Sequence, residues 1–275
     1  MERLQTPQGF MKTSGKIASG KRSFRIGMIV PSSNVTMEKE IPQMLQSLDG
    51  ENASQFTFHS SRVRLQKVSP EELKKMNANA ANAALELTDA SVDVILYACL
   101  VAVMVEGKGA HIESEERIRN TLAKEDKSIP IVTSAGALVA TLHDIKASKI
   151  AVIAPYLPAL TQTVCGYLQA ENIEVVSSCS LSVDDNLEVG KLDQGQLVEI
   201  AQTLPKDVDA VVLSACVQMP SLDVIEEVEK LLRKPVISAA TATVYQMMKK
   251  LDIHPAILGY GDLLAGKLTQ KVDSV

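Results

Sequence analysis

Two cysteines, Cys99 and Cys216, follow short apolar runs at matching places in the two halves of the chain. The first run is 94–99 (VILYAC) and the second is 211–216 (VVLSAC). A thiol at the end of a strand, where a helix begins, can ionise and act as a nucleophile or as an acid–base group. Because two thiols occupy equivalent positions, we expect both to do chemistry rather than to serve only as small apolar core residues.

The segments around the two cysteines also correspond, and in the same order. Segment 25–31 (RIGMIVP) is echoed by 149–155 (KIAVIAP), and 129–135 (IPIVTSA) by 234–240 (KPVISAA). An internal repeat of this size predicts an α/β fold of two pseudo-symmetric lobes. We expect the lobes to face each other across a cleft, with one cysteine brought to the cleft from each side.

Short β-branched runs alternate with longer helix-like stretches, a pattern typical of parallel sheets flanked by helices. We expect a four-stranded sheet in each lobe, with strands near 25–30, 55–59, 92–98 and 129–133, and near 149–154, 173–178, 208–214 and 235–238. Helices are expected near 35–48, 70–88, 112–126 and after Ala135, and then near 158–171, 193–204, 221–233 and 240–251. A last short strand, 256–259, is expected to return to the first lobe.

The first 24 residues differ from the rest, since they hold five basic residues and a single acid among glycines and serines. We interpret residues 1–24 as a flexible extension. Residues 25–147 then form the N-terminal lobe, joined by the returning C-terminal segment, and 148–275 form the C-terminal lobe.

Composition narrows the function. The chain has 275 residues, 46% of them hydrophobic, which is enough for two lobes with their own cores. A net charge of −5 and 3% aromatic residues give no support for nucleic-acid binding. The apolar stretches are strand-length, well below the roughly 20 residues of a membrane span. Four cysteines without a signal peptide indicate reduced thiols, so we expect a cytoplasmic protein.

No cofactor motif follows a strand. The chain has no glycine-rich dinucleotide or phosphate loop, no CxxC, and no histidine pair at metal-ligand spacing. We therefore expect chemistry without metal or cofactor. The glycine-rich segment 106–111 (EGKGAH) is interpreted as a flap over the cleft, or else as a solvated loop.

In open α/β sheets, ligands bind beyond the carboxyl ends of the strands. The loops that meet there follow Val30, Ala98, Ala154 and Ala215. Cys99 and Cys216 lie at this edge, whereas Cys165 and Cys179 do not.

Polar side chains near the same edge are candidate substrate contacts. Asn34 lies in 31–38 (PSSNVTME) and can donate its amide to a carboxylate, although the segment must also cap a helix. Tyr156 can donate a hydroxyl, or it can simply pack on the neighbouring prolines. Asn186 can face the cleft from the second lobe.

Backbone donors are expected directly after each cysteine. Leu100 and Val101 follow Cys99, and Val217 and Gln218 follow Cys216. Their side chains offer little polar chemistry, so contacts to substrate would come from backbone N–H groups, which bind carboxylates well at helix starts.

Over most of residues 25–262 the chain resembles the maleate cis–trans isomerases, a branch of the aspartate/glutamate racemase superfamily. The resemblance rests on 30–38 (VPSSNVTME), 98–102 (ACLVA) and 214–221 (SACVQMPS). Amino-acid racemases of the superfamily usually follow the cysteine with Asn-Thr, and arylmalonate decarboxylases keep only one of the two cysteines. This chain has neither pattern.

The resemblance implies cofactor-independent isomerisation of maleate to fumarate through a covalent succinyl-cysteine. It implies Cys99 as the nucleophile, Cys216 as its acid–base partner, and Asn34, Tyr156 and Asn186 as substrate-binding groups. A small dicarboxylate is then the substrate, and we expect a homodimer with no nucleic-acid or membrane partner. The alternatives are a cofactor-independent racemase or epimerase of a small carboxylic acid, and a non-catalytic two-lobed small-molecule binding protein.

Overall fold

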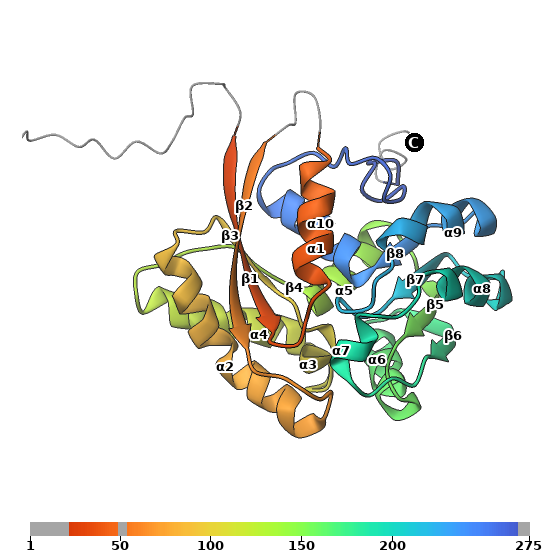
Figure 1. Ribbon diagram of the computed structural model, residues 1–275, viewed down its shortest axis with the longest axis horizontal. Helices are drawn as coiled ribbons and strands as arrows, with labels where there is room; N and C mark the ends of the chain where they lie inside the picture. Colours follow the sequence, from red (N-terminus) through yellow and green to blue (C-terminus); the bar gives the residue numbers. More distant parts are fainter. Residues whose placement is uncertain (1–21, 49–53, 269–275) are drawn as a thin grey trace, which may run out of the picture.

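Two parallel four-stranded sheets form the centre of the protein, whose computed structural model describes residues 22–48 and 54–268. The first sheet has the order β2-β1-β3-β4, with β1 (Ser23–Pro31), β2 (Gln55–Val63), β3 (Val94–Tyr97) and β4 (Ile131–Thr133). The second has the order β6-β5-β7-β8, with β5 (Lys149–Ala154), β6 (Glu174–Ser180), β7 (Ala210–Ser214) and β8 (Val236–Ser238). The two orders are equivalent strand by strand, and the sheets lie side by side (Figure 1). The predicted fold of two similar lobes is confirmed.

Helices flank both sheets. Around the first lie α1 (Met37–Gln46), α2 (Pro70–Asp89), α3 (Leu100–Met104), α4 (Ala110–Ala123) and α5 (Ser134–Asp144). Around the second lie α6 (Pro158–Ala170), α7 (Asn186–Val189), α8 (Gly195–Thr203), the 3₁₀ helix η2 (Leu222–Val224), α9 (Ile225–Leu232) and α10 (Ala239–Lys250). The eight strands expected within the two lobes are all present, with ends that differ by a few residues. The helix start expected directly after Cys99 is present as the short helix α3, whereas Cys216 is followed by a turn and not by a helix. The short helix α7 was not expected.

The local sequence explains where several helices begin. The Ser69 side chain accepts the N–H of Glu72, and Pro70 occupies the first turn of α2, as expected of a helix start. Thr133 and Ser238 cap α5 and α10 in the same way at equivalent places of the repeat. These two helices pack against each other, so the repeat also builds the contact between the two halves.

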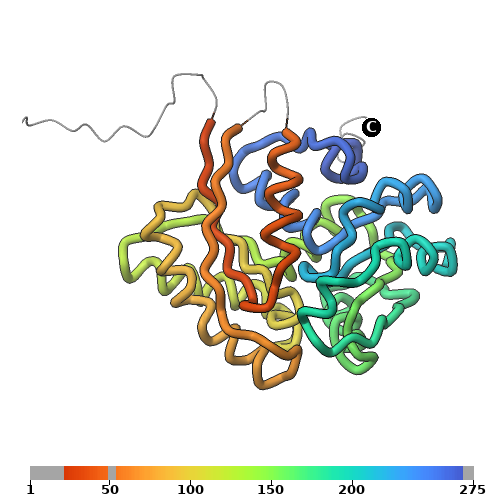
Figure 2. Tube along the Cα trace, viewed as in Figure 1, coloured from red at the N-terminus to blue at the C-terminus, as the bar shows by residue number. Residues whose placement is uncertain are grey.

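The expected strand at 256–259 is wrong. Ile257 is buried but Leu258 is largely exposed, and the backbone N–H of Ile257 bonds locally to Leu264 instead of to a strand. The segment nevertheless runs back across the top of the molecule (Figure 2). Tyr260 there lies 3.4 Å, hydroxyl to hydroxyl, from Ser47 at the end of α1.

The first strand begins earlier than predicted. Ser23 and Phe24 belong to β1 rather than to an extension, and the Phe24 ring stacks on Phe56 of β2 at 5.8 Å between centroids. Residues 1–21 of the predicted extension lie outside the described residues.

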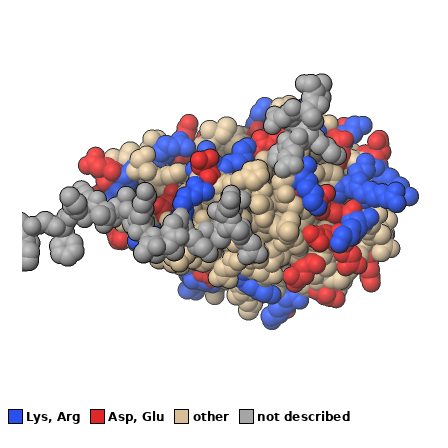
Figure 3. Space-filling view, turned by 90° about the horizontal axis from the view of Figure 1, so that it is seen from above, with Lys and Arg blue, Asp and Glu red and all other residues tan. Residues whose placement is uncertain are grey.

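Lys and Arg side chains are interspersed with Asp and Glu over the visible part of the face in Figure 3, consistent with a net charge of only −5. None of the described helices is long and apolar enough to cross a membrane. The carboxyl ends of β1, β3, β5 and β7 point toward the boundary between the two sheets, where the loops of the candidate site meet.

Candidate active site

A small, largely buried cavity lies between the two halves. It is lined by Pro31, Asn34, Leu65, Val68, Leu73, Ala98, Cys99, Leu100, Val101, Tyr156, Asn186, Cys216, Val217 and Gln218. All nine residues predicted from the sequence for the site are among them. The space open to the centre of a water molecule is about 20 Å³, which is room for about one water molecule.

Cys99 and Cys216 reach this cavity from opposite halves. Cys99 is the residue before α3, two positions after the end of β3, and Cys216 is likewise two positions after the end of β7. Only 6% of Cys99 and 7% of Cys216 is exposed. Cys165 and Cys179 are half-buried in α6 and β6 and do not line the cavity.

The cavity disfavours a thiolate at Cys99. The pKa of the Cys99 thiol is raised to about 12, mainly by burial and also by a negative charge on Cys216, and the backbone N–H of Ala102 opposes this only partly. Because each thiolate repels the other, the pair holds at most one negative charge near neutral pH.

Cys216 has more donors around it. Burial raises the pKa of the Cys216 thiol, but the Tyr156 hydroxyl and the backbone N–H groups of Gln218 and Met219 favour the thiolate. The N–H of Gln218 lies 3.4 Å from Cys216 Sγ. Burial raises the pKa of Tyr156 well above its usual value, so its hydroxyl keeps its proton, and it donates to the carbonyl of Ala215 at 3.2 Å.

Asn34 offers an unused donor to the cavity. Its Oδ1 accepts the backbone N–H groups of Thr36 at 3.1 Å and Met37 at 3.0 Å and so caps the start of α1. Its Nδ2 has no hydrogen-bond partner among the described residues, although only 1% of the residue is exposed. An unsatisfied buried donor costs roughly 1–3 kcal/mol, which an oxygen of a bound ligand would recover.

Asn186 is the first residue of α7 and is also buried. Its Nδ2 donates to Ser33 Oγ at 2.8 Å, and the Ser33 hydroxyl donates to the carbonyl of Leu65 at 2.5 Å. This chain of contacts links the second lobe to the wall of the cavity.

The backbone donors predicted after each cysteine do not all remain available. Leu100 and Val101 form the first turn of α3, where N–H groups have no acceptor within the helix. Val217 also lines the cavity. The N–H of Gln218, however, is directed at Cys216 Sγ, and its side-chain amide bonds the backbone of Val35 and Asn186.

Sequence reasoning missed Glu40 of α1. Its Oε1 accepts the N–H groups of Ser221 and Leu222, at 3.1 and 3.2 Å, on the loop that follows Cys216. Burial raises the pKa of Glu40 to about 7. The sequence of α1 could have indicated this, because Glu40 lies at helical spacing on the same face as the buried residues Met37, Ile41 and Met44.

The segment 106–111 is not a flap over the cavity. Gly109 N donates to Glu171 at 2.8 Å, and His111 hydrogen-bonds the Tyr167 hydroxyl, so the segment is tied to α6 of the other lobe. The outer wall of the cavity is instead formed by apolar residues. Val68, Leu73 and Tyr156 separate it from an open groove of about 690 Å³.

Comparison with known proteins agrees with this geometry. The family model described as arylmalonate decarboxylase matches residues 26–264. The maleate isomerase of Geobacillus stearothermophilus is 51% identical over 248 residues, which cover 90% of this chain and 99% of that protein. The maleate isomerase of Alcaligenes faecalis is 50% identical over 247 residues, which cover 89% and 98%.

Solved structures give the same result. A Cys-to-Ala variant of the maleate isomerase from Pseudomonas putida S16, with maleate, has a TM-score of 0.87 at 47% identity, covering 89% of this chain and 98% of that one. A Cys-to-Ser mutant of the Nocardia farcinica enzyme, with a covalently bound succinylcysteine intermediate, has a TM-score of 0.86 at 43% identity, covering 88% and 98%. Arylmalonate decarboxylase, at 20% identity and a TM-score of 0.69 over 87% of this chain and 98% of that one, shares the fold. The chain belongs to the maleate isomerase family, within the wider group that the arylmalonate decarboxylase model describes.

Proposed function

We propose that the protein isomerises maleate to fumarate through a covalent succinyl adduct of Cys99. The observation that supports this most directly is the pairing of two buried thiols, brought from equivalent strand ends, at one cavity. The curated relatives that match nearly the whole chain are maleate isomerases. Maleate cannot rotate about its double bond until that bond becomes a single bond. Addition of a thiol to one of the two alkene carbons achieves this.

The first step couples the two thiols. Because the Tyr156 hydroxyl and backbone N–H groups favour a thiolate at Cys216, the form that reacts in our mechanism has Cys216 ionised and Cys99 protonated. As Cys99 Sγ adds to one alkene carbon, its proton passes to Cys216. The electron pair of the double bond moves to the neighbouring carbon and its carboxylate, which forms an enediolate.

The remaining steps return the enzyme to its starting state. Cys216 gives its proton to the carbanionic carbon and so completes the succinyl thioether. Rotation about the new single bond brings the carboxylates to opposite sides. Cys216 then removes a proton from the same carbon, the double bond re-forms, and the C–S bond to Cys99 breaks. Proton transfer from Cys216 to the Cys99 thiolate closes the cycle.

Polar groups of the cavity would hold the two carboxylates. In our proposal the donors are Asn34 Nδ2, Asn186, the first-turn N–H groups of α3 and, once Cys216 is protonated, the Tyr156 hydroxyl. Donors fixed in advance in a site that excludes water stabilise the enediolate more strongly than water does. The cavity is too small for a four-carbon diacid as it stands, so the wall of Val68 and Leu73 must move outward to admit substrate.

Proton NMR of maleate in the presence of the enzyme tests the function, since maleate and fumarate give separate vinyl signals. We expect conversion of maleate and no racemisation of aspartate or glutamate. Monomethyl maleate should be a far poorer substrate, because an ester leaves buried donors unpaired at roughly 1–3 kcal/mol and misplaces the reacting carbon. Equal kcat/KM for maleate and the monoester would show that the cavity does not bind both ends.

We also propose that residues 25–147 and 148–275 form the two lobes, and that the enzyme is a cytoplasmic homodimer without metal or cofactor. The internal repeat, the reduced cysteines and the lack of cofactor motifs support these assignments. Size-exclusion chromatography with light scattering tests the dimer, and activity after exhaustive dialysis against a chelator tests the independence from metal.

A further inference from the structure

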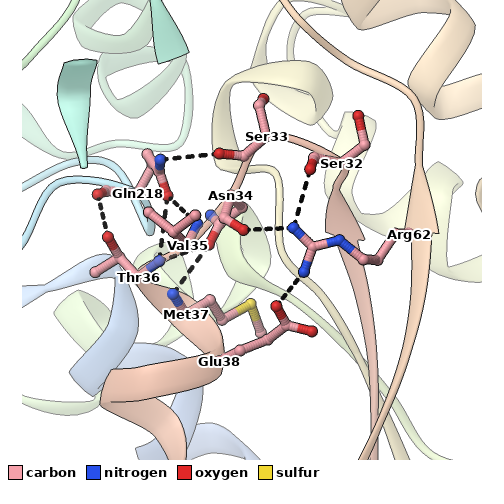
Figure 4. A network of polar contacts seen from close by, with 9 residues as sticks. All are labelled: Ser32, Ser33, Asn34, Val35, Thr36, Met37, Glu38, Arg62 and Gln218. Atoms are coloured by element: carbon pink, nitrogen blue, oxygen red, sulfur yellow. Dashed lines mark hydrogen bonds and ion pairs between the residues drawn. The ribbon is translucent and has the colours of Figure 1, made fainter. Parts of the chain in front are cut away.

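The side-chain amide of Gln218 is buried and joins the two halves of the protein beside the cavity. Its Oε1 accepts the backbone N–H groups of Val35 at 2.8 Å and Thr36 at 3.3 Å. Its Nε2 donates to the backbone carbonyls of Ser33 at 3.1 Å and Asn186 at 2.8 Å (Figure 4 shows the contacts to the first-lobe loop). A primary amide has two N–H donors and an oxygen with two lone pairs, so these contacts use its full capacity.

The loop that Gln218 holds contains Asn34. On the other side of this loop, Arg62 of β2 donates to the carbonyls of Ser32 at 2.9 Å and Asn34 at 2.7 Å, and pairs with Glu38 (Figure 4). The backbone around Asn34 is therefore fixed from within its own lobe by Arg62 and from the other lobe by Gln218. This backbone determines the orientation of the Asn34 side-chain amide, whose Nδ2 has no hydrogen-bond partner among the described residues.

Gln218 also touches the second lobe's part of the site. Its bond to the Asn186 carbonyl fixes the start of α7, and its own N–H lies 3.4 Å from Cys216 Sγ. Thr36 Oγ1 returns a bond to the Gln218 carbonyl at 2.7 Å. One residue thus sets the relative position of two asparagines and a thiol that come from three separate loops.

Gly190, just after α7, provides a second and independent observation. A Cβ built there would lie 2.8 Å from Gln218 Nε2 and 2.9 Å from Val35 Cγ2. Its φ is −68°, so the backbone would accept any residue. The absence of a side chain is explained by the space that the Gln218 amide occupies, rather than by backbone conformation.

We propose that Gln218 is a positioning residue, whose side-chain amide aligns Asn34 and Asn186 with the two thiols and so sets how the substrate carboxylates are bound. Gly190 leaves the room that this alignment needs. The proposal rests on the isomerase function proposed above and assigns to Gln218 a role through other residues rather than direct contact with substrate.

Kinetics of Gln218→Leu, Gln218→Glu and Gly190→Ala test the proposal. Leu removes all four bonds, whereas Glu keeps an acceptor but places a second oxygen against the carbonyls of Ser33 and Asn186. We expect Gln218→Leu to lower kcat/KM about 100-fold, mostly through KM, since misplacement of substrate by about 1 Å has effects of that size. Gly190→Ala should lower it about 10-fold by displacing the amide. Gly166→Ala, at a helical glycine with open space around it, is the control and should match the wild type.

A double-mutant cycle with Asn34→Ala separates positioning from general loss of stability. If Gln218 acts through Asn34, then Asn34→Ala should cost little further in the Gln218→Leu background. Measurements are made well below the melting temperature of each variant. The proposal would be overturned if the two substitutions reduced kcat/KM independently, so that their fold-losses multiplied. It would also be overturned if kcat/KM of Gln218→Leu lay within threefold of the wild type.

Backbone amide hydrogen exchange tests the role of Gln218 without any measurement of enzyme activity. In Gln218→Leu and Gly190→Ala, the backbone amides of Val35 and Thr36 should exchange faster than in the wild type and in Gly166→Ala. Unchanged exchange rates at Val35 and Thr36 would overturn the positioning role of Gln218 even if the variant turns over maleate. A wild-type enzyme that leaves maleate unchanged would instead overturn the proposed function, while exchange would still decide the role of Gln218.

Discussion

The carboxylate of Glu40, on α1 of the first lobe, accepts a hydrogen bond at 3.1 Å from the backbone N–H of Ser221, five positions after Cys216 in the second. Burial raises the pKa of Glu40 to about 7, although this bond and the one from Leu222 favour the ionised form. A carboxyl group in the inter-lobe contact therefore titrates near neutral pH, and its charge raises the pKa of the Cys216 thiol.

This relationship predicts a pH-dependent stability. Between pH 4.5 and 7 the unfolded chain has lost the Glu40 proton while the folded chain retains it. The folded state binds more protons, so the contribution of Glu40 to stability falls as pH rises through this window and levels off above pH 7. The free energy of unfolding of Glu40→Gln, relative to that of the wild type, should therefore increase by up to roughly 3 kcal/mol between pH 5 and pH 8.

Urea denaturation of both proteins at several pH values measures this difference. Glu116→Gln removes an exposed carboxylate from α4 and serves as the control. A difference between wild type and Glu40→Gln that stays constant with pH would show that Glu40 does not titrate in this window.

Substitution of the two cavity thiols should abolish or strongly reduce turnover. Cys99→Ala removes the nucleophile and should leave no measurable isomerisation. Cys216→Ala removes the acid–base partner and should lower kcat at least about 100-fold. Cys165→Ala and Cys179→Ala are matched controls outside the cavity. Equal damage from either control would show that the cavity has been assigned to the wrong cysteines.

Tyr156→Phe should shift the pH profile. The Tyr156 hydroxyl favours the thiolate of Cys216, so its removal raises the pKa of that thiol. The alkaline rise of kcat/KM, which reports formation of the thiolate, should therefore move to higher pH. At neutral pH, loss of one bond to a charged group should lower kcat/KM about 10- to 100-fold. Tyr167→Phe changes a buried tyrosine on α6 that lies outside the cavity, and should leave the profile unchanged.

A disulfide across the cavity wall should block substrate entry. Lys67, beside the wall residue Val68, forms an antiparallel bridge with Asp185, just before α7. Such pairs have Cα atoms about 4.5–5.5 Å apart, within the range of disulfides. Oxidised Lys67→Cys/Asp185→Cys should lose activity about 10-fold or more and regain it on reduction.

The two single variants under the same oxidant control for oxidation of the cavity thiols and for loss of the α7 cap at Asp185. Full activity of the oxidised double variant, with the disulfide shown by mass spectrometry, would mean that substrate enters elsewhere.

The sequence predicted the two sheets and the thiol pair because the internal repeat places Cys99 and Cys216 at equivalent strand ends. It also placed Asn34 at the cavity, since a polar segment leaves β1 at the ligand-binding edge. The role of the Gln218 side chain could not be predicted from the sequence. Its partners in the first-lobe loop lie more than 180 positions away, and no sequence periodicity marks them. Glu40 was missed although its place on an apolar helix face was readable.

The wrong strand at 256–259 has a physical cause. A short apolar run forms a strand only where its backbone pairs with a neighbouring strand. Neither sheet of the described residues takes up this segment, and its backbone instead turns back on itself, with the Ile257 N–H donating to the Leu264 carbonyl.

The mass of the Cys99 peptide, after the Cys216→Ser variant has been mixed with maleate, tests the covalent mechanism most directly. Without Cys216 the carbanionic carbon can still take a proton from water, but no thiolate removes a proton from carbon to release the product, so an adduct on the nucleophile should accumulate. We predict that the peptide containing Cys99 gains the mass of one maleic acid, and that Cys165 and Cys179 stay unmodified. Slow turnover with no adduct at Cys99, or an adduct on another cysteine, would contradict the account.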